Sequence, residues 1–461
     1  MSKSRIVIDI TTLQKWRRFP VGIVRTQLEF TKYCIVNISN CGFVAFDDSK
    51  SVLKNVERNE VLSLLKDYEL ESWQAVETNS PTLDKVGMLT YLKIVFSLIR
   101  KKEYMQLTKS IYRKTPTRVR GILRKYLEPI FRSRIEISSN KKGSISSSLF
   151  SPESHLALQN EKLLDKNDIL ICMGLDWDFS NYSLLYEMKK NSNFQVVTCF
   201  YDSIPISYPE LVHSDYFGKV FFSHMYKLNY LSDKVFCISD FSKKSYENIA
   251  KETHFSSIPN LRTIYLGDDI NKVDLIDNGN KDKGHILYVS TIEARKNHIL
   301  LLNVWNMLIS KYGEKTPKLI LVGMKGWGVD DFYELYSHDE NLKKYVDIRS
   351  NVSDYQLSLL YKNSQFCVFP SIVEGWGLGA AESLSYGKAC LVSDCEALSE
   401  ATQSLMPALP NDSQAWFDQI TKLIDEPENL IELQEKVEKN FKPRSWNDFC
   451  TDFHNYILEA K

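Results

Sequence analysis

Short apolar runs alternate with longer segments of helical character along much of the chain. The runs have four to six residues and are typical of strands buried in a parallel sheet. The predicted strands are Arg5–Asp9, Asp168–Met173, Gln195–Phe200, Lys234–Ile238, Ile286–Val289 and Phe366–Ser371. The clearest predicted helices are Ile23–Tyr33, Asn297–Tyr312 and Ala380–Tyr386. This alternation predicts an α/β fold with parallel sheets.

The length of 461 residues favours two domains over one. A polar stretch at 271–284 predicts the linker between them. We therefore expect two Rossmann-like, doubly wound domains, 1–270 and 285–440, followed by a last helix within 441–461. Two such domains facing a cleft would place their ligand loops at the carboxyl ends of parallel strands.

Two glutamates, Glu374 and Glu382, frame a glycine-rich stretch between a predicted strand and a predicted helix. Gly375, Gly377 and Gly379 allow a sharp turn and let bare N–H groups approach a ligand closely. A strand, a glycine loop and a helix N-terminus form a site that suits phosphate. Carboxylates cannot neutralise phosphate, so their predicted partners are hydroxyls. The stretch therefore predicts a sugar-nucleotide site.

A pair of cations, Arg295 and Lys296, lies in the loop that follows the predicted strand at 286–289. The guanidinium can bind a diphosphate through two hydrogen bonds, and the ammonium adds a point charge. Either feature alone is also typical of ordinary α/β loops and solvated surfaces. Both features in one βα-repeating domain favour a functional site.

These stretches resemble family 4 of the retaining, nucleotide-sugar-dependent glycosyltransferases, which have the GT-B fold. The strong resemblance covers about 285–405, in segments 289–297, 319–323, 352–354, 369–378 and 382–388. Weaker similarities occur at 21–25, 201–206 and 237–242. The resemblance implies that the helix within 441–461 crosses back to the N-terminal domain, which would bind the acceptor.

The resemblance also implies roles for individual residues. Arg295 and Lys296 would stabilise the leaving diphosphate, Glu374 would contact the donor sugar, and Glu382 would hold the ribose hydroxyls. Asp202 is the candidate base for the acceptor hydroxyl, although the donor phosphate can itself take that proton. Further donor-binding candidates are Gly22, Gly323, Val352, Ser353, Trp376, Gly377, Leu378 and Gly379. No metal and no other cofactor are expected, because the nucleotide sugar is a co-substrate.

Segments 291–298 and 374–378 look most like bacterial mannosyltransferases that use GDP-mannose in the assembly of surface polysaccharide, either lipopolysaccharide or capsule. The expected reaction is transfer of a hexose, mannose, to a lipid-linked or growing polysaccharide. UDP- or TDP-sugars of glucose, N-acetylglucosamine or rhamnose are alternative donors. The same fold also supports epimerases, phosphorylases and a non-enzymatic, membrane-associated scaffold. A scaffold would be expected to have a damaged donor site, which this sequence does not show.

Residues 93–142 contain 15 lysines and arginines but only three glutamates, in a chain whose formal net charge is zero. Apolar residues are interleaved with these cations, which predicts a basic helical insertion at about 85–150 in contact with an anionic membrane surface. A solvated insertion is the alternative, and nucleic acid ranks last because no binding motif accompanies the charge. The nine scattered cysteines, no signal peptide and no long apolar run predict a cytoplasmic protein, peripheral at the inner face of the cytoplasmic membrane.

Overall fold

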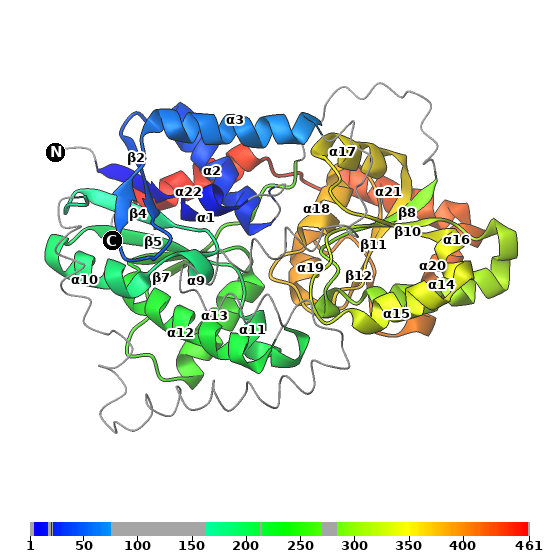
Figure 1. Ribbon diagram of the computed structural model, residues 1–461. Coiled ribbons are helices and arrows are strands. Elements are labelled where there is room, and N and C mark those ends of the chain that lie inside the picture. Colours follow the sequence, from blue (N-terminus) through cyan, green and yellow to red (C-terminus); the bar gives the residue numbers. More distant parts are fainter. Residues whose placement is uncertain are drawn as a thin grey trace, which may run out of the picture. The chain divides into compact units, whose positions relative to one another are not determined.

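The computed structural model describes residues 4–16, 20, 22–74, 163–212, 214–269 and 284–459. Two β-sheets organise these residues (Figure 1). The predicted basic insertion and most of the predicted linker lie outside the described residues. Among the described residues, no helix combines the length and the apolar composition needed to cross a membrane.

The first sheet has seven strands in the order β3-β2-β1-β4-β5-β6-β7. All of its neighbouring strands are parallel except β2 and β3, which are antiparallel. The strands are β1 (Arg5–Asp9), β2 (Cys41–Phe46), β3 (Leu53–Asn55), β4 (Asp168–Cys172), β5 (Gln195–Phe200), β6 (Lys234–Cys237) and β7 (Asn260–Thr263). The four strands predicted in this half of the chain are thus present.

Helices cover both faces of the first sheet. They are α1 (Thr11–Lys15), α2 (Ile23–Asn37), α3 (Arg58–Gln74), α9 (Asp176–Phe179), α10 (Tyr182–Ser192), α11 (Ile204–Ser207), α12 (Asp215–Leu231), α13 (Asp240–Glu252) and the last helix of the chain, α22 (Trp446–Leu458). In β4, Ile169 and Ile171 pack toward α2, α3 and α22, whereas Leu170 and Cys172 pack toward α10, α12 and α13. This alternation is the period of two expected for a strand buried on both faces.

The last helix packs against the first sheet, far from it in sequence. The ring of Phe453 lies 4.4 Å from that of Phe236 in β6 and 4.6 Å from that of Phe30 in α2. At the C-terminus of α22, the Nζ of Lys234 donates hydrogen bonds to the carbonyls of Tyr456 and Ile457 at 2.8 and 3.2 Å. A cation there is favourable because the last carbonyls of a helix carry partial negative charge.

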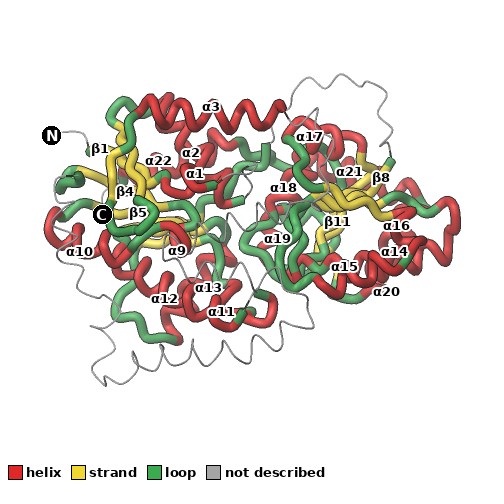
Figure 2. Tube along the Cα trace, viewed as in Figure 1, coloured by secondary structure: helices red, strands yellow, loops and turns green. Residues whose placement is uncertain are grey.

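The second sheet is entirely parallel and has the order β10-β9-β8-β11-β12-β13. Its strands are β8 (His285–Val289), β9 (Leu319–Val322), β10 (Val346–Arg349), β11 (Ser364–Phe369), β12 (Cys390–Ser393) and β13 (Ala408–Leu409). Its helices are α14 (His298–Tyr312), α15 (Asp330–His338), α16 (Glu340–Tyr345), α17 (Asp354–Asn363), α18 (Leu378–Ser385), α19 (Glu396–Ala401), α20 (Ser413–Asp425) and α21 (Pro427–Asn440). Figure 2 distinguishes the strands of each sheet from the helices around them.

Several predicted boundaries around the second sheet differ from the structure by one or two residues, and the starts of two helices matter for the site. Helix α18 begins at Leu378, two residues earlier than predicted, so Gly379 lies in its first turn and not in the loop. Helix α14 begins at His298 because Asn297 precedes it with a left-handed φ of 55°. All nine cysteines are free thiols and all except Cys41 are buried, as their apolar surroundings predict.

Candidate functional site

The loops that follow β8 and β11 bring three of the predicted site residues into contact. The Nη1 of Arg295 donates a hydrogen bond to Oε2 of Glu374 at 2.8 Å, and the Nζ of Lys296 donates one to Oε1 of Glu374. Strands β8 and β11 are parallel neighbours, so their carboxyl ends lie at the same edge of the sheet. The sheet topology therefore joins residues that are almost 80 positions apart in sequence.

A second buried carboxylate, Glu293, completes this charged cluster. The Nε of Arg295 donates to Oε2 of Glu293 at 3.1 Å, and only 5% of Glu293 is exposed. Burial raises the pKa of Glu293, while Arg295 and Lys296 lower it, and the net shift is upward. Two cations and two carboxylates therefore form one cluster, in which Glu293 and Glu374 balance the positive charges of Arg295 and Lys296.

The charge on Glu374 is held in place by its partners. Burial by itself raises the pKa of this carboxyl, but Lys296 and Arg295 outweigh burial and lower the pKa to about 2. Each carboxylate oxygen has a further lone pair after binding its cation, so Glu374 can still accept a hydroxyl. Among the described residues, the Nη2 of Arg295 has no hydrogen-bond partner and can bind an anion.

The glycine loop packs closely against the carboxyl end of β5. A side chain at Gly375 would place its Cβ 2.7 Å from the carbonyl oxygen of Tyr201, and the carbonyl of Gly375 accepts a hydrogen bond from Ser239 Oγ at 2.6 Å. Gly377 has a φ of 114° and would bring a Cβ to 2.4 Å from Leu398. Both positions therefore require glycine, one for close approach and one for backbone conformation.

The start of α18 suits an anion. No side chain caps this helix, and its first turn contains no acidic residue. The N–H groups of Leu378 and Gly379 are the first in the helix and have no carbonyl partner within it. Such N–H groups, together with the helix dipole, favour a phosphate.

Asp202 follows β5 and lies next to the glycine loop. Its Oδ1 accepts a hydrogen bond from the N–H of Ile204 at 3.0 Å, which caps a turn before α11. Burial raises the pKa of Asp202, although the nearby charge of Arg295 opposes this shift. The structure thus places Asp202 close to the Glu374 cluster and gives it a local structural role, and a role as base remains a prediction.

Glu382 belongs to a separate part of the site, on the inner side of α18. It is 5% exposed and accepts a hydrogen bond from the hydroxyl of Tyr361 at 2.9 Å. Burial raises the pKa of Glu382 to about 7, with the charge of Arg25 in α2 opposing the rise. Within the described residues, Glu382 makes no hydrogen bond or ion pair with the Glu374 cluster.

Three further predicted donor residues have clear structural roles. The indole of Trp376 is 8% exposed, stacks on Tyr265 with ring centroids 5.1 Å apart, and belongs to the hydrophobic core of the first sheet. Leu378 packs against the same core. A Cβ at Gly323 would meet the carbonyl oxygen of Ser290 at 1.9 Å, so this glycine permits close packing between two loops.

The remaining predicted donor residues lie at helix starts. Ser353 caps α17 in a capping box with Gln356, and Val352 packs against the core of the second sheet. Gly22 precedes α2 with a φ of 51°, and a Cβ there would meet no atom within 4 Å. The positive φ, and not close packing, therefore favours glycine at position 22, and its contact with a ligand remains a prediction.

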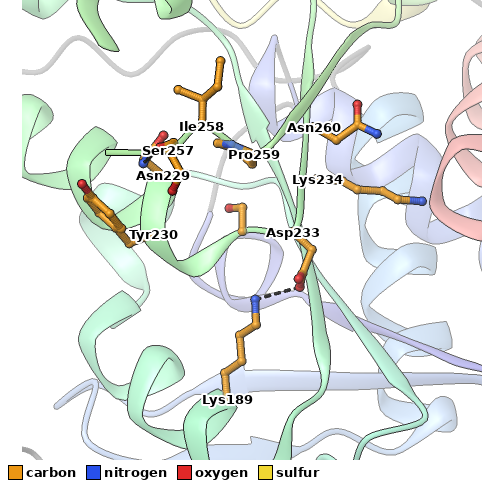
Figure 3. Close-up of a pocket in the computed structure, with 10 residues that line it drawn as sticks. Lys189, Asn229, Tyr230, Asp233, Lys234, Ser257, Ile258, Pro259 and Asn260 are labelled. Carbon is orange, nitrogen blue, oxygen red and sulfur yellow. Dashed lines mark hydrogen bonds and ion pairs between the residues drawn. The ribbon is translucent and has the colours of Figure 1, made fainter. Parts of the chain in front are cut away.

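The pocket in Figure 3 does not belong to this site. It has a volume of about 430 Å³ and lies at the amino ends of β6 and β7, whereas Asp202 follows the carboxyl end of β5. Its charged groups serve the fold, since Lys189 is paired with Asp233 at 2.7 Å and Lys234 binds the end of α22. In the described part of the chain, no three His, Cys, Asp or Glu side chains gather as a metal site.

Sequence reasoning missed Glu293, Tyr361 and Asp354 as neighbours of the predicted residues. Glu293 is only two residues from Arg295, so the sequence already indicates that the two side chains lie close together. Tyr361 gives no such signal, because its contact with Glu382 depends on how α17 packs beside α18. Asp354 receives Arg25 from α2, a pairing between distant segments that no local pattern reveals.

Residues 273–443 match the family model described as Glycosyl transferases group 1. The chain is 32% identical over 134 residues to the O-antigen chain mannosyltransferase B of Escherichia coli, covering 29% of this chain and 35% of that protein. It is 24% identical over 241 residues to the O-antigen chain mannosyltransferase RfbU of Salmonella typhimurium, covering 51% of this chain and 63% of that protein. The chain thus spans less than two thirds of either curated relative.

A solved structure extends the likeness to nearly the whole chain. The crystal structure of Anabaena HepE in complex with UDP and glucose covers 98% of this chain and 99% of its own, with a TM-score of 0.57 and 11% sequence identity. At this identity the likeness shows the fold, which is GT-B. The predicted resemblance to GT-B glycosyltransferases is confirmed, whereas membership of family 4 and retaining chemistry remain predictions.

Proposed function

We propose that this chain is a retaining, nucleotide-sugar-dependent hexosyltransferase. The observation that carries this proposal is the pairing of Arg295 and Lys296 with Glu374, beside the uncapped start of α18, in a segment that matches group 1 glycosyl transferases. The cations and the helix start suit a diphosphate, and the buried carboxylates suit hydroxyls of a sugar and a ribose.

The proposed reaction breaks the bond between the anomeric carbon and the phosphate oxygen of the donor. The acceptor hydroxyl oxygen forms the new bond on the same face of the sugar, and the electron pair of the broken bond leaves with the nucleoside diphosphate. The acceptor proton passes to that phosphate or to Asp202. Arg295, Lys296 and the first N–H groups of α18 stabilise the growing negative charge, and removing one such group typically costs about 3 kcal/mol of barrier.

For the donor we propose GDP-mannose. One support is the amino-acid sequence of segments 291–298 and 374–378. The other is the similarity of the chain to two O-antigen chain mannosyltransferases. The acceptor in this proposal is a lipid-linked or growing polysaccharide. No metal enters the proposed reaction, because Arg295 and Lys296 supply the positive charge next to the diphosphate.

We also propose that residues 93–142 hold the enzyme at the anionic inner face of the cytoplasmic membrane, near such an acceptor. The support is the excess of 12 positive charges in this segment, interleaved with apolar residues. The segment lies outside the described residues, so its sequence alone supports this part of the proposal.

The experiment that tests the proposed function is a thermal-shift panel of GDP, UDP, TDP and ADP without metal, run on the full chain and on Glu382→Ala. A ligand at about 100 times its dissociation constant stabilises a protein by about 2.7 kcal/mol. We expect a shift with GDP that Glu382→Ala abolishes. The matched control is Glu435→Ala, which removes an exposed glutamate of α21 paired with Lys439 at 3.0 Å.

Each outcome of the panel decides one part of the proposal. A shift with UDP or TDP in place of GDP would keep the transferase and overturn the mannose donor. A shift that Glu382→Ala leaves intact would overturn the assignment of the donor site. No shift with any nucleotide would overturn the proposed function.

A further inference from the structure

Arg25 links the first sheet's layer of helices to the candidate donor site. It lies in the first turn of α2, and its Nη2 donates to Oδ2 of Asp354, the first residue of α17. Arg25 is only 8% exposed, and its buried Nε has no hydrogen-bond partner. A buried guanidinium with an unused donor is costly unless charged groups nearby compensate it.

Three nearby carboxyls compensate Arg25, and one of them is the donor-site candidate Glu382. Its positive charge interacts with Asp354, Glu382 and Glu29, which together raise the pKa of Arg25 despite burial. Glu382 in turn is faced by Arg25 from α2, by Tyr361 and Asp354 from α17, and by Asp268 after β7. Arg25 is the only cation in this set.

We propose that Arg25 is a positioning residue that acts through Glu382 and keeps this carboxyl in the charged form that accepts ribose hydroxyls. This inference rests on the proposed function, because it takes Glu382 as the ribose ligand. Arg25 comes from α2, beside the first sheet, whereas Glu382 comes from α18, beside the second sheet. The donor site is therefore complete only when both segments are in contact.

Arg25 and Asp354 shift the pKa of Glu382 in opposite directions, and this difference distinguishes a positioning role of Arg25 from a purely structural one. Burial raises the pKa of Glu382, Arg25 lowers it, and Asp354 raises it. Substituting either Arg25 or Asp354 breaks the same ion pair. If the ion pair only holds the two segments together, Arg25→Gln and Asp354→Asn will change nucleotide binding in the same way. If Arg25 acts through Glu382, Arg25→Gln will raise the pKa of Glu382 and Asp354→Asn will lower it.

The test is the pH dependence of GDP and UDP binding to the full chain between about pH 5.5 and 9, by calorimetry. The wild-type affinity is expected to rise through a midpoint near pH 7, as Glu382 ionises. Arg25→Gln should move the midpoint up by about one pH unit and Asp354→Asn should move it down by a similar amount. Arg25→Lys should bring the midpoint back toward that of the wild type.

The terminal phosphate of GDP also titrates, near pH 6, but it does so equally for every variant, so the differences between variants report the protein. Midpoints that move in the same direction for Arg25→Gln and Asp354→Asn would overturn the role of Arg25 while leaving nucleotide binding and the proposed function in place. No binding to the wild type would overturn the proposed function, and the role of Arg25 with it. If Arg25→Gln fails to fold, Asp354→Asn still tests the role of Arg25, because a midpoint that does not fall below that of the wild type would overturn it.

Discussion

Arg295 donates a hydrogen bond to Glu374 at 2.8 Å, from the loop after β8 to the loop after β11. Lys296 donates to the other oxygen of the same carboxylate. Glu374 therefore orients both cations before any ligand binds, and such preorganised charges lower a barrier more than mobile ones do. The carboxylate acts on the diphosphate indirectly, in addition to any contact with the donor sugar.

Replacing Glu374 by glutamine should cost activity and stability together. The amide can accept from one cation, but its NH₂ group would face the other. We expect kcat/KM to fall on the order of a hundredfold, as for the loss of one oriented charge at a transition state. The free energy of unfolding should fall by about 3–5 kcal/mol, because two buried cations lose their charged partner.

The pH dependence of this stability follows from the lowered pKa of Glu374. Its ordinary value is 4.5 and its folded value about 2, so the carboxylate stabilises the fold above pH 4.5 and loses this contribution as the pH falls toward 2. The free energies of unfolding of the wild type and of Glu374→Gln should therefore become more similar as the pH falls from 4.5 toward 2. A gap that stays constant down to pH 2 would contradict the ion-pair explanation, and Glu435→Gln on exposed α21 is the control.

Tyr361 should matter through its hydroxyl, which donates to Glu382 at 2.9 Å and to the carbonyl of Gly379 at 3.2 Å. Tyr361→Phe keeps the ring stacked on Tyr386, whose centroid is 5.3 Å away. Losing a hydrogen bond to a charged group costs about 1.5–3 kcal/mol, so nucleotide affinity should fall at least about tenfold. The measurement is calorimetric binding of GDP and UDP.

The matched control for Tyr361 is its stacking partner. The hydroxyl of Tyr386 donates to Ser358 Oγ at 2.8 Å, in α17. Tyr386→Phe should thus leave nucleotide affinity within about twofold of the wild type. Equal losses in the two variants would mean that packing, and not the hydroxyl of Tyr361, sets the affinity.

Glu400 should stabilise the contact between α19 and the start of α13. Its two carboxylate oxygens accept hydrogen bonds from the N–H groups of Asp240 and Phe241, each at 2.7 Å. Because this arrangement acts as a helix cap, Glu400→Ala should cost about 1–2 kcal/mol of stability. Glu396→Ala, which breaks an exposed ion pair with Lys244 in the same helix pair, should cost less than about 1 kcal/mol. Chemical unfolding of the two variants provides the comparison.

The parallel sheets, and the place of Arg295 and Glu374 at one edge of the second sheet, were largely predictable from the sequence. Buried strands read as short apolar runs, and glycine positions mark where a loop turns between a strand and a helix. Once β8 and β11 are placed in one parallel sheet, the loops after them must share an edge. The pairing of the predicted cations with a predicted carboxylate was not anticipated, because residue types suggested a ligand for each separately.

The environment of Glu382 could not be read from the chain. Its burial, its hydrogen bond from Tyr361 and the charge of Arg25 all depend on how helices from separate segments pack together. Trp376 is a similar case, because its place in a binding motif predicts that its backbone N–H faces a ligand, but does not indicate that its side chain joins the core of the first sheet. A motif identifies a loop, but the surrounding fold decides which of its side chains face a ligand.

The basic segment 93–142 gives a prediction that depends only on charge. The full chain should sediment with vesicles that contain about 30% anionic lipid and not with zwitterionic vesicles, because each cation near an anionic surface contributes about 1 kcal/mol. Higher salt should release it, since screening weakens these attractions. Equal binding to both kinds of vesicle, or to neither, would contradict the proposed membrane contact.

Ionisation of Glu382 should lower the stability of the fold and raise its affinity for the nucleotide. Its folded pKa of about 7 lies above the ordinary 4.5, so its contribution to stability is fully present below pH 4.5 and is lost as the pH rises through 7. Over the same range the carboxylate that accepts ribose hydroxyls is formed, so nucleotide affinity should rise while the free energy of unfolding falls. Functional sites commonly carry such a cost.

Glu382→Gln separates the two effects because it is neutral at every pH and nearly the same size. Compared with the wild type, the variant should be similarly stable at pH 5 and more stable at pH 8, and it should bind GDP at least about tenfold more weakly above pH 7. Urea unfolding at the two pH values, with calorimetric binding at the higher one, measures both. Equal destabilisation at pH 5 and pH 8 would show that the buried carboxyl is a packing element, and undiminished binding would remove it from the donor site.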